Sequence, residues 1–143
     1  MSTNRICEFG FPGPLRDRLV TAVLNGTKTA TSSLLIEWQL DGEPLPVAGE
    51  RADVVDSEGR TVGTIEILTA DIVRLGDVDD HIARAEGEDY STAAGWRTEH
   101  ERFWRDEVSP GLPAGQAPAF TDDLPIVIQW FRLDGLARGG SPQ

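Results

Sequence analysis

A helical segment that ends at Asn25-Gly26 constrains the fold of this chain most. Apolar residues recur at helical spacing over Leu15–Leu24, with charged residues 16–18 on the opposite side. Asn and Gly tolerate the left-handed conformation that ends helices, so the helix is predicted to stop there. The stretch Thr27–Leu35 is rich in β-branched and small residues and is expected to leave the turn as a strand.

Helices and strands are predicted along the rest of the chain. Alternating apolar residues bounded by turn formers indicate strands at 51–55, 61–68, 71–75 and 124–133. Helical spacing predicts a short helix over 77–84 and another from Ser91 or Thr92 to about Glu107, because Ser and Thr are good N-caps. Residues 135–143 have little to bury and are expected to be a disordered tail, which leaves residues 1–134 as a single domain.

The charge of the chain limits its partners. The net charge is −11, and residues 1–35 alone hold more Lys and Arg (4) than Asp and Glu (2). Because phosphate neutralisation dominates nucleic-acid affinity, broad binding to duplex DNA is not expected. A nucleoside, or a short single strand of RNA in a local pocket, remains compatible with this charge.

The sequence indicates no membrane helix, no internal disulfide and no metal site. There is no apolar run of the ~18 or more residues that a membrane helix needs, and residues 1–5 lack a signal-peptide core, so a cytoplasmic protein is expected. Cys7 is the only cysteine and cannot form an internal disulfide. His81 and His100 are not joined by a ligand spacing, so no metal and no cofactor is predicted.

Lys28 is the only lysine in a chain with twelve arginines. Unlike arginine, a lysine can act as a base when its surroundings make it neutral, and a threonine hydroxyl such as that of Thr31 needs such a neighbour to act as a nucleophile. The alternative is a solvated lysine followed by a strand threonine. On a regular strand the two side chains would point to opposite faces, so the chemical interpretation requires the chain to be still turning at residues 28–30.

The motif Gly26–Thr31 resembles the signature of the ASCH domain, a relative of the PUA-like RNA-binding modules. The resemblance runs from about Gly10 to Leu133 and includes Ala85-Glu-Gly87, the Trp96–Trp104 run and the closing strand that ends in Phe131-Arg-Leu133. It implies an α+β fold, a PUA-like small β-barrel of about five to six strands flanked by two to three helices.

The resemblance also implies an activity. Small bacterial ASCH proteins similar to this chain hydrolyse the acetyl group of N(4)-acetylcytidine with the Lys and Thr of the motif and a downstream Glu. The Lys and Thr fall on Lys28 and Thr31. Glu86 is the expected acidic partner, and Glu88 is the alternative because that loop is longer here. A hydrolase acting on a modified nucleoside is therefore the leading hypothesis.

Further residues are candidates for substrate contact. Trp38 could stack on a base or fill the core, and the Trp96–Trp104 stripe is mainly core-facing, with Trp96 or His100 as possible rim residues. Gln129 stands where larger family members carry an acidic residue, which is expected to weaken or change specificity. The full set of binding candidates is Gly26, Thr29, Ser32, Glu37, Trp38, Arg16, Glu88, Trp96 and Gln129.

Two other functions remain open at this stage. One is a ribonuclease, which would need a long basic groove leading from Lys28. The other is a non-catalytic RNA-binding or regulatory module, in which Trp38 and the arginines would matter more than Thr31. Fold resemblance does not choose among them. The oligomeric state also stays open, with a dimer possible.

Overall fold

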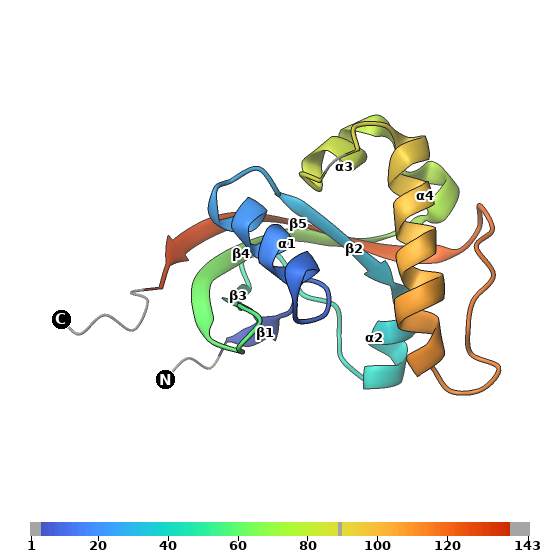
Figure 1. The fold of residues 1–143 in the computed structure, drawn as a ribbon, viewed down its shortest axis with the longest axis horizontal. Coiled ribbons are helices and arrows are strands. Elements are labelled where there is room, and N and C mark those ends of the chain that lie inside the picture. The colour runs from blue at the N-terminus through green and yellow to red at the C-terminus, as the bar shows by residue number, and fades with distance from the viewer. Residues whose placement is uncertain (1–3, 89, 138–143) are drawn as a thin grey trace.

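A five-stranded mixed sheet organises the structure (Figure 1). The computed structural model describes residues 4–88 and 90–137. The sheet order is β1-β3-β4-β5-β2, with β1 parallel to β3 and the other pairs antiparallel. The strands are β1 (Arg5–Cys7), β2 (Ala30–Leu34), β3 (Arg51–Val55), β4 (Thr61–Arg74) and β5 (Pro125–Leu136).

β4 and β5 form the long central ribbon of the sheet. The two strands predicted at 61–68 and 71–75 are one continuous strand, which bends at register shifts between Thr64 and Ile65 and between Ile67 and Thr69. β5 continues to Leu136, which pairs with Gly63. The tail predicted for residues 135–143 therefore begins inside this strand, and residues 138–143 lie outside the described part.

The α+β class is confirmed, but the expected closure into a barrel is wrong. In the described part of the chain, β1 and β2 are the two edges of an open sheet. β1 pairs over only three residues, and β2 passes directly into helix α2 at Leu35, so neither strand offers the length that closure requires. Side chains of both edge strands line an open groove instead.

The helices are α1 (Pro14–Leu24), α2 (Leu35–Asp41), α3 (Asp80–Ala85) and α4 (Ala93–Phe103). α1 ends as predicted at Asn25, and Gly26 follows with φ +84°. Thr92 caps α4 by accepting a hydrogen bond from the Gly95 N–H. α2 was not predicted. Short helical turns lie at Leu75–Asp77, before α3, and at Trp104–Val108 and Ser109–Gly111, after α4.

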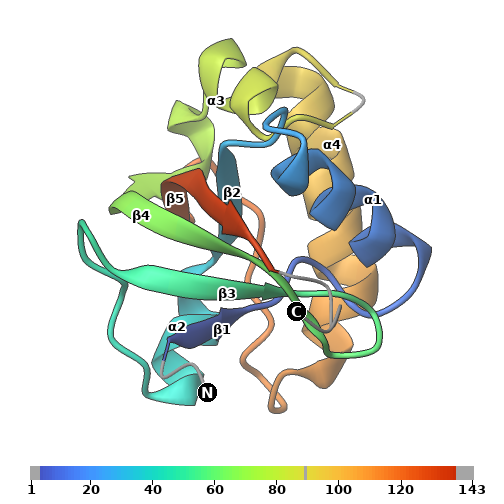
Figure 2. The same ribbon diagram turned by 90° about the vertical axis from the view of Figure 1, so that its left-hand side faces the viewer.

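Two apolar clusters hold the helices to the sheet. One joins β2 and β5 to α3 and α4 and contains the fully buried Trp96 and nearly buried Trp104. The other packs α1, through Val20 and Val23, against the central strands. Figure 2 shows α1 and α4 on the same side of the sheet. None of the helices in residues 4–88 and 90–137 combines the length and apolar composition that a membrane span requires.

Gly87 allows the chain after α3 to lie against the segment before β2. Its φ is +70°, and a Cβ at this position would lie 2.6 Å from the Thr27 carbonyl oxygen and 2.8 Å from the Lys28 Cα. Both neighbours are backbone atoms, which cannot move aside as a side chain does. Only glycine fits, and this close approach brings Glu86 to Lys28.

We predict that Gly87→Ala destabilises the protein by about 2 kcal/mol or more, because it adds a backbone clash to an unfavourable left-handed conformation. Urea unfolding of the purified variant measures this loss. Gly111→Ala is the control, since a Cβ at Gly111 meets nothing within 4 Å. Equal stability of the two variants would contradict the role given to Gly87.

Candidate active site around Lys28

Three elements fix the backbone around Lys28. The Lys28 N–H donates to the Ala22 carbonyl at the end of α1 (3.0 Å), and the Thr29 N–H donates to the Ala85 carbonyl at the end of α3 (2.8 Å). The Phe131 N–H of β5 donates to the Thr29 carbonyl (3.0 Å). β2 begins only at Ala30, so the chain is still turning at residues 28–29. The condition for Lys28 and Thr31 to line one pocket is met.

The Lys28 side chain is only 1% exposed. Its Nζ donates to the Ala30 carbonyl (2.9 Å), the Glu86 carbonyl (3.2 Å) and Glu86 Oε1 (3.4 Å). Glu88 Oε2 lies 4.0 Å away. Three acceptors match the three hydrogens of an ammonium group, whereas a neutral amine has only two. The resting arrangement is therefore that of a charged lysine.

Four donors surround the buried Glu86 carboxylate. Oε1 faces Lys28 and, at 3.3 Å, His100 Nε2, while Oε2 accepts from Ser32 Oγ and Trp96 Nε1, both at 2.7 Å. Burial alone would raise the pKa of Glu86. The charges of His100 and Lys28 and the hydrogen bonds outweigh burial and lower the pKa to about 2. Glu86 is a fixed anion.

His100 lies between two acceptors. Its Nδ1 is 2.9 Å from the Trp96 carbonyl, and its Nε2 faces Glu86. A neutral imidazole donates from only one nitrogen, so the protonated ring fits this arrangement best. Burial lowers the pKa of His100, but the charge and hydrogen bond of Glu86 outweigh it, so the pKa lies above its ordinary value of 6.5. The positive charges of Lys28 and His100 thus balance the negative charges of Glu86 and Glu88.

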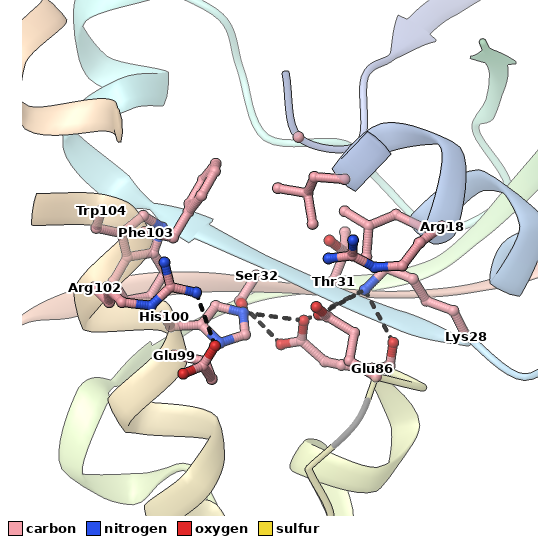
Figure 3. Close-up of a pocket in the computed structure, with 14 residues that line it drawn as sticks. Arg18, Lys28, Thr31, Ser32, Glu86, Glu99, His100, Arg102, Phe103 and Trp104 are labelled. Carbon is pink, nitrogen blue, oxygen red and sulfur yellow. Dashed lines mark hydrogen bonds and ion pairs between the residues drawn. The ribbon is translucent and has the colours of Figure 1, made fainter. Parts of the chain in front are cut away.

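A small pocket of about 130 Å³ opens over this ion pair, between α1 and α4 (Figure 3). Its lining comes from α1 and the turn before it, from Lys28 and β2, from the Glu86 loop, and from α4 and the turn after it: Gly10, Leu15, Arg18, Leu19, Lys28, Thr31, Ser32, Glu86, Glu88, Glu99, His100, Arg102, Phe103 and Trp104.

Thr31 differs from the other hydroxyl residues of its segment. Thr27 bonds to Asn25, and Thr29 donates to a backbone carbonyl. The hydroxyls after Thr31 in β2 are also engaged, one with Glu86 and one with Trp38. Within residues 4–88 and 90–137, the Thr31 hydroxyl has no hydrogen-bond partner, and Thr31 lines the pocket.

A larger groove of about 840 Å³ lies beside the pocket and shares lining residues with it: Gly10, Thr31, Ser32, Phe103 and Trp104. It runs over the sheet between β1 and α2, where a closed barrel would have paired β1 with β2. Glu37, Trp38 and Gln129 are among its lining residues. Burial raises the pKa of Glu37, whose carboxylate accepts a hydrogen bond from the Leu34 N–H.

The family model of the ASCH domain matches residues 5–133. This chain belongs to the ASCH domain family. Two solved structures share its fold. A crystal structure of protein EF3133 from Enterococcus faecalis V583 is 27% identical with a TM-score of 0.80, covering 100% of this chain and 87% of that one. An ASCH domain from Lactobacillus crispatus JV V101 is 25% identical with a TM-score of 0.70, covering 84% and 72%. Comparison with curated proteins gives no match.

The structure of this ASCH protein brings together the three residues predicted to carry chemistry. Lys28, Thr31 and Glu86 line one pocket. Glu88, the alternative acid, also lines it, but it lies farther from Lys28 than Glu86 does and accepts a hydrogen bond from the Tyr90 hydroxyl (2.6 Å). Glu86 is therefore the closer partner of Lys28. Ser32, Glu37, Trp38 and Gln129 also lie in the pocket or the groove.

Four predicted substrate contacts have structural roles instead. Arg16 is 3% exposed and donates to Glu8 and to the Gly10 carbonyl inside the protein, so its guanidinium does not face a ligand. Trp96 is fully buried, and its indole N–H donates a hydrogen bond to Glu86 Oε2. Gly26 forms the left-handed turn after α1, and Thr29 bonds to α3. Neither of these last two lines the pocket or the groove.

His100, which the sequence suggested only as a possible rim residue, lies in the pocket and contacts Glu86. Trp96 and His100 are spaced i, i+4 on α4, which puts both side chains on one helix face. The spacing favoured a core stripe, and the signal that marks His100 is the nearby Glu86, which only the fold supplies.

Glu86, Glu88 and His100 also present ligand atoms within 4.8 Å of one another. A divalent cation at this place would compete with the Lys28 ammonium, which already contacts both carboxylates. Nε2 of His100 would have to lose its proton to bind a metal. The donor set fits a lysine-centred charge network better than a metal site.

The charge network should make stability depend on pH in two directions. Folding lowers the pKa of Glu86 from 4.5 to about 2, so its contribution is present above pH 4.5 and is lost as the pH falls toward 2. Folding raises the pKa of His100 above 6.5, so its contribution is present below pH 6.5 and is lost as the pH rises through the folded-state value.

We predict that Glu86→Gln destabilises the protein by about 3–5 kcal/mol near pH 6, because Lys28 and His100 lose their buried counter-charge. Urea unfolding across the acid range should show the gap closing as the pH approaches 2. Glu58→Gln, which alters a carboxylate with 68% side-chain exposure, is the control. A pH-independent gap between wild type and Glu86→Gln would contradict the assignment.

Proposed function

We propose that this ASCH protein is a hydrolase that removes an acyl group from the exocyclic amine of a modified nucleoside, with N(4)-acetylcytidine as the first substrate to test. The observation that carries the proposal is the unengaged Thr31 hydroxyl in a pocket that also contains the buried Lys28–Glu86 pair. The resemblance to ASCH proteins that use a Lys, a Thr and a Glu for this reaction supports it.

The reaction requires two proton transfers. When Thr31 Oγ1 attacks the acyl carbon, its proton must pass to a base, and the leaving nitrogen must gain a proton as the C–N bond breaks. Lys28 performs both steps in turn, first as an amine and then as an ammonium. Water then hydrolyses the acyl-threonine ester, which releases a carboxylic acid and restores the hydroxyl. Because the resting contacts fit the ammonium, Lys28 first releases one proton to solvent at the mouth of the pocket and then accepts the proton of Thr31.

Glu86 acts in this scheme as a positioning anion. A carboxyl group with a pKa of about 2 does not supply a proton near neutral pH. Its contact with Lys28 Nζ instead holds the amine in place in the pocket. Ser32, Trp96 and His100 hold the carboxylate in place.

In this proposal each cavity holds a different part of the ligand. The pocket of about 130 Å³ suits an acyl group, while the groove of about 840 Å³ is in the range of small-molecule sites and suits a base with its sugar. Thr31 lines both, so the scissile amide lies at their junction. Trp38, half-buried in the groove wall, offers a ring face beside the base.

The groove is a poor match for an RNA strand. Its lining includes five carboxylates: Glu8, Glu37, Asp41, Glu43 and Glu50. It includes one arginine, Arg5, which forms an ion pair with Glu50 at 2.7 Å. Carboxylates repel a chain of phosphates, and a ribonuclease would need the opposite charge along its groove. This charge favours an uncharged nucleoside over the ribonuclease alternative.

We predict that the purified protein converts N(4)-acetylcytidine to cytidine, as measured by chromatography. Thr31→Val, which removes the nucleophile and keeps the shape, should lower kcat/KM by at least about 1,000-fold. Lys28→Met should do the same. Thr69→Val, at an exposed strand position outside both cavities, should retain wild-type activity.

The outcomes separate the candidate functions. Conversion that survives Thr31→Val would overturn the nucleophile assignment. Failure of the wild-type protein to convert the substrate at high enzyme concentration would exclude this substrate. Binding of short single-stranded RNA without turnover would then favour the non-catalytic module.

A further inference from the structure

The pocket over the Lys28–Glu86 pair differs in charge from the groove beside it. With His100 protonated, its lining carries four cationic side chains and three carboxylates: Arg18, Lys28, His100 and Arg102, and Glu86, Glu88 and Glu99. The groove is lined by five carboxylates and one arginine. In a chain of net charge −11, a cavity with excess positive charge is a local exception. Because the charge that lines a cavity favours ligands of opposite sign, the two cavities suit different parts of a ligand.

Arg18 accounts for the excess positive charge. The other charged side chains of the pocket all have polar partners: Lys28 and His100 contact Glu86, Glu88 accepts a hydrogen bond from Tyr90, and Arg102 pairs with Glu99. Across residues 4–88 and 90–137, the Arg18 guanidinium makes no hydrogen bond or ion pair, and Arg18 is exposed at the pocket rim. Its five N–H donors are therefore available to an anionic ligand.

The sequence of α1 directs Arg18 to the pocket. Leu15, Arg18 and Leu19 all line it, and their spacing of i, i+3 and i+4 places the three side chains on one face of the helix. Figure 3 shows the Arg18 side chain reaching from α1 into the pocket. The two leucines are half-buried and form an apolar wall beside the guanidinium. Such a wall suits methylene groups, and the guanidinium suits a carboxylate, which it binds through two parallel hydrogen bonds.

We infer that Arg18 makes the pocket selective for an acyl group that ends in a carboxylate, such as a succinyl group. The inference deepens the proposed function and rests on it for the place of the scissile amide. With the acyl carbon at Thr31, the acyl chain extends into the pocket, its methylene groups lie against Leu15 and Leu19, and its terminal carboxylate pairs with Arg18. The substrate class is a cytidine that carries a dicarboxylic acid as a half-amide on N4.

The place of Arg18 favours this carboxylate over a phosphate on the nucleoside. Arginine binds both anions, but Arg18 lines only the pocket and not the groove that holds the base and sugar. The arginine of the groove, Arg5, already pairs with Glu50. A phosphate on the sugar would meet the carboxylates of the groove, which repel it. The terminal carboxylate of the acyl group is the anion that reaches Arg18.

The reaction on this substrate is a balanced hydrolysis. One water molecule is consumed, the bond between the acyl carbon and N4 breaks, and N4 gains a proton to give cytidine. The acyl group leaves as succinate, whose newly formed carboxyl group releases its proton to solvent at neutral pH. Arg18 takes no part in the proton transfers, because a guanidinium stays protonated. It acts by positioning the acyl chain.

The test compares two ligands of equal size. N(4)-succinylcytidine ends in a carboxylate, and N(4)-succinamoylcytidine carries a neutral carboxamide in the same place. Chromatography measures kcat/KM for each with the full-length protein, after subtraction of the rate without enzyme. We expect the wild-type protein to prefer the carboxylate by at least about 10-fold, the effect of one hydrogen-bonded charge pair. Salt at about 0.5 M should reduce this preference, because Arg18 is exposed.

Variants at position 18 isolate the effect of the charge. Arg18→Gln should remove the preference, and Arg18→Lys, which keeps the charge without the planar fork, should keep part of it. Arg105→Gln makes the same chemical change at an exposed position outside both cavities and should keep the full preference. Thermal melting checks that each variant is folded, and if Arg18→Gln does not fold, Arg18→Lys and the salt dependence carry the test.

Binding is measured apart from turnover in Thr31→Val, which cannot form the acyl ester. Calorimetric titration of this variant with each ligand should show the carboxylate binding at least about 10-fold more tightly. Adding Arg18→Gln in the same background should remove the difference.

Three results overturn the inference: equal kcat/KM and equal affinity for the two ligands, a preference that Arg18→Gln leaves unchanged, or no binding of either ligand. Hydrolysis of both ligands with either of the first two results would leave the proposed function standing alone. A binding preference that depends on Arg18, without hydrolysis of either ligand, would instead remove the proposed function and keep the recognition.

Discussion

The buried pair of Lys28 and Glu86 is the interaction on which the rest of the structure depends. Both side chains are 1% exposed, and transfer of each charge from water costs several kcal/mol unless hydrogen bonds and opposite charges replace the solvent. The replacement comes from β2, α4 and two backbone carbonyls. The packing of these elements around one point is what makes the pair stable.

The same contacts leave one reactive group unengaged. Ser32 is committed to Glu86 and Ser33 to Trp38, whereas the Thr31 hydroxyl faces the cavity. Strand periodicity separates Thr31 from Ser32, because neighbouring side chains of β2 point to opposite faces. Ser33 shares the face of Thr31 but accepts a hydrogen bond from Trp38. Rigid surroundings around a free hydroxyl are typical of a site organised before the ligand binds.

The open sheet serves the site as well. Closing the barrel would pair β1 with β2 and fill the space that the groove now occupies. The groove therefore depends on a short β1 and on α2, which begins directly after β2. Its lining is acidic, with five carboxylates against one arginine.

Local patterns in the sequence determined α1, its end at Asn25-Gly26, the strand β3 and the α4 cap, because each depends on residues a few positions apart. The family motif located Lys28 and Thr31. The resemblance favoured Glu86 over Glu88, but no sequence pattern indicated that His100 contacts Glu86 or that Arg16 is buried. Nor could the sequence show that the barrel stays open. Lys28 and Glu86 are 58 positions apart in the chain, so no local pattern relates their charges. Tertiary packing brings the two side chains together away from water, and Gly87 permits the close backbone approach that this packing needs.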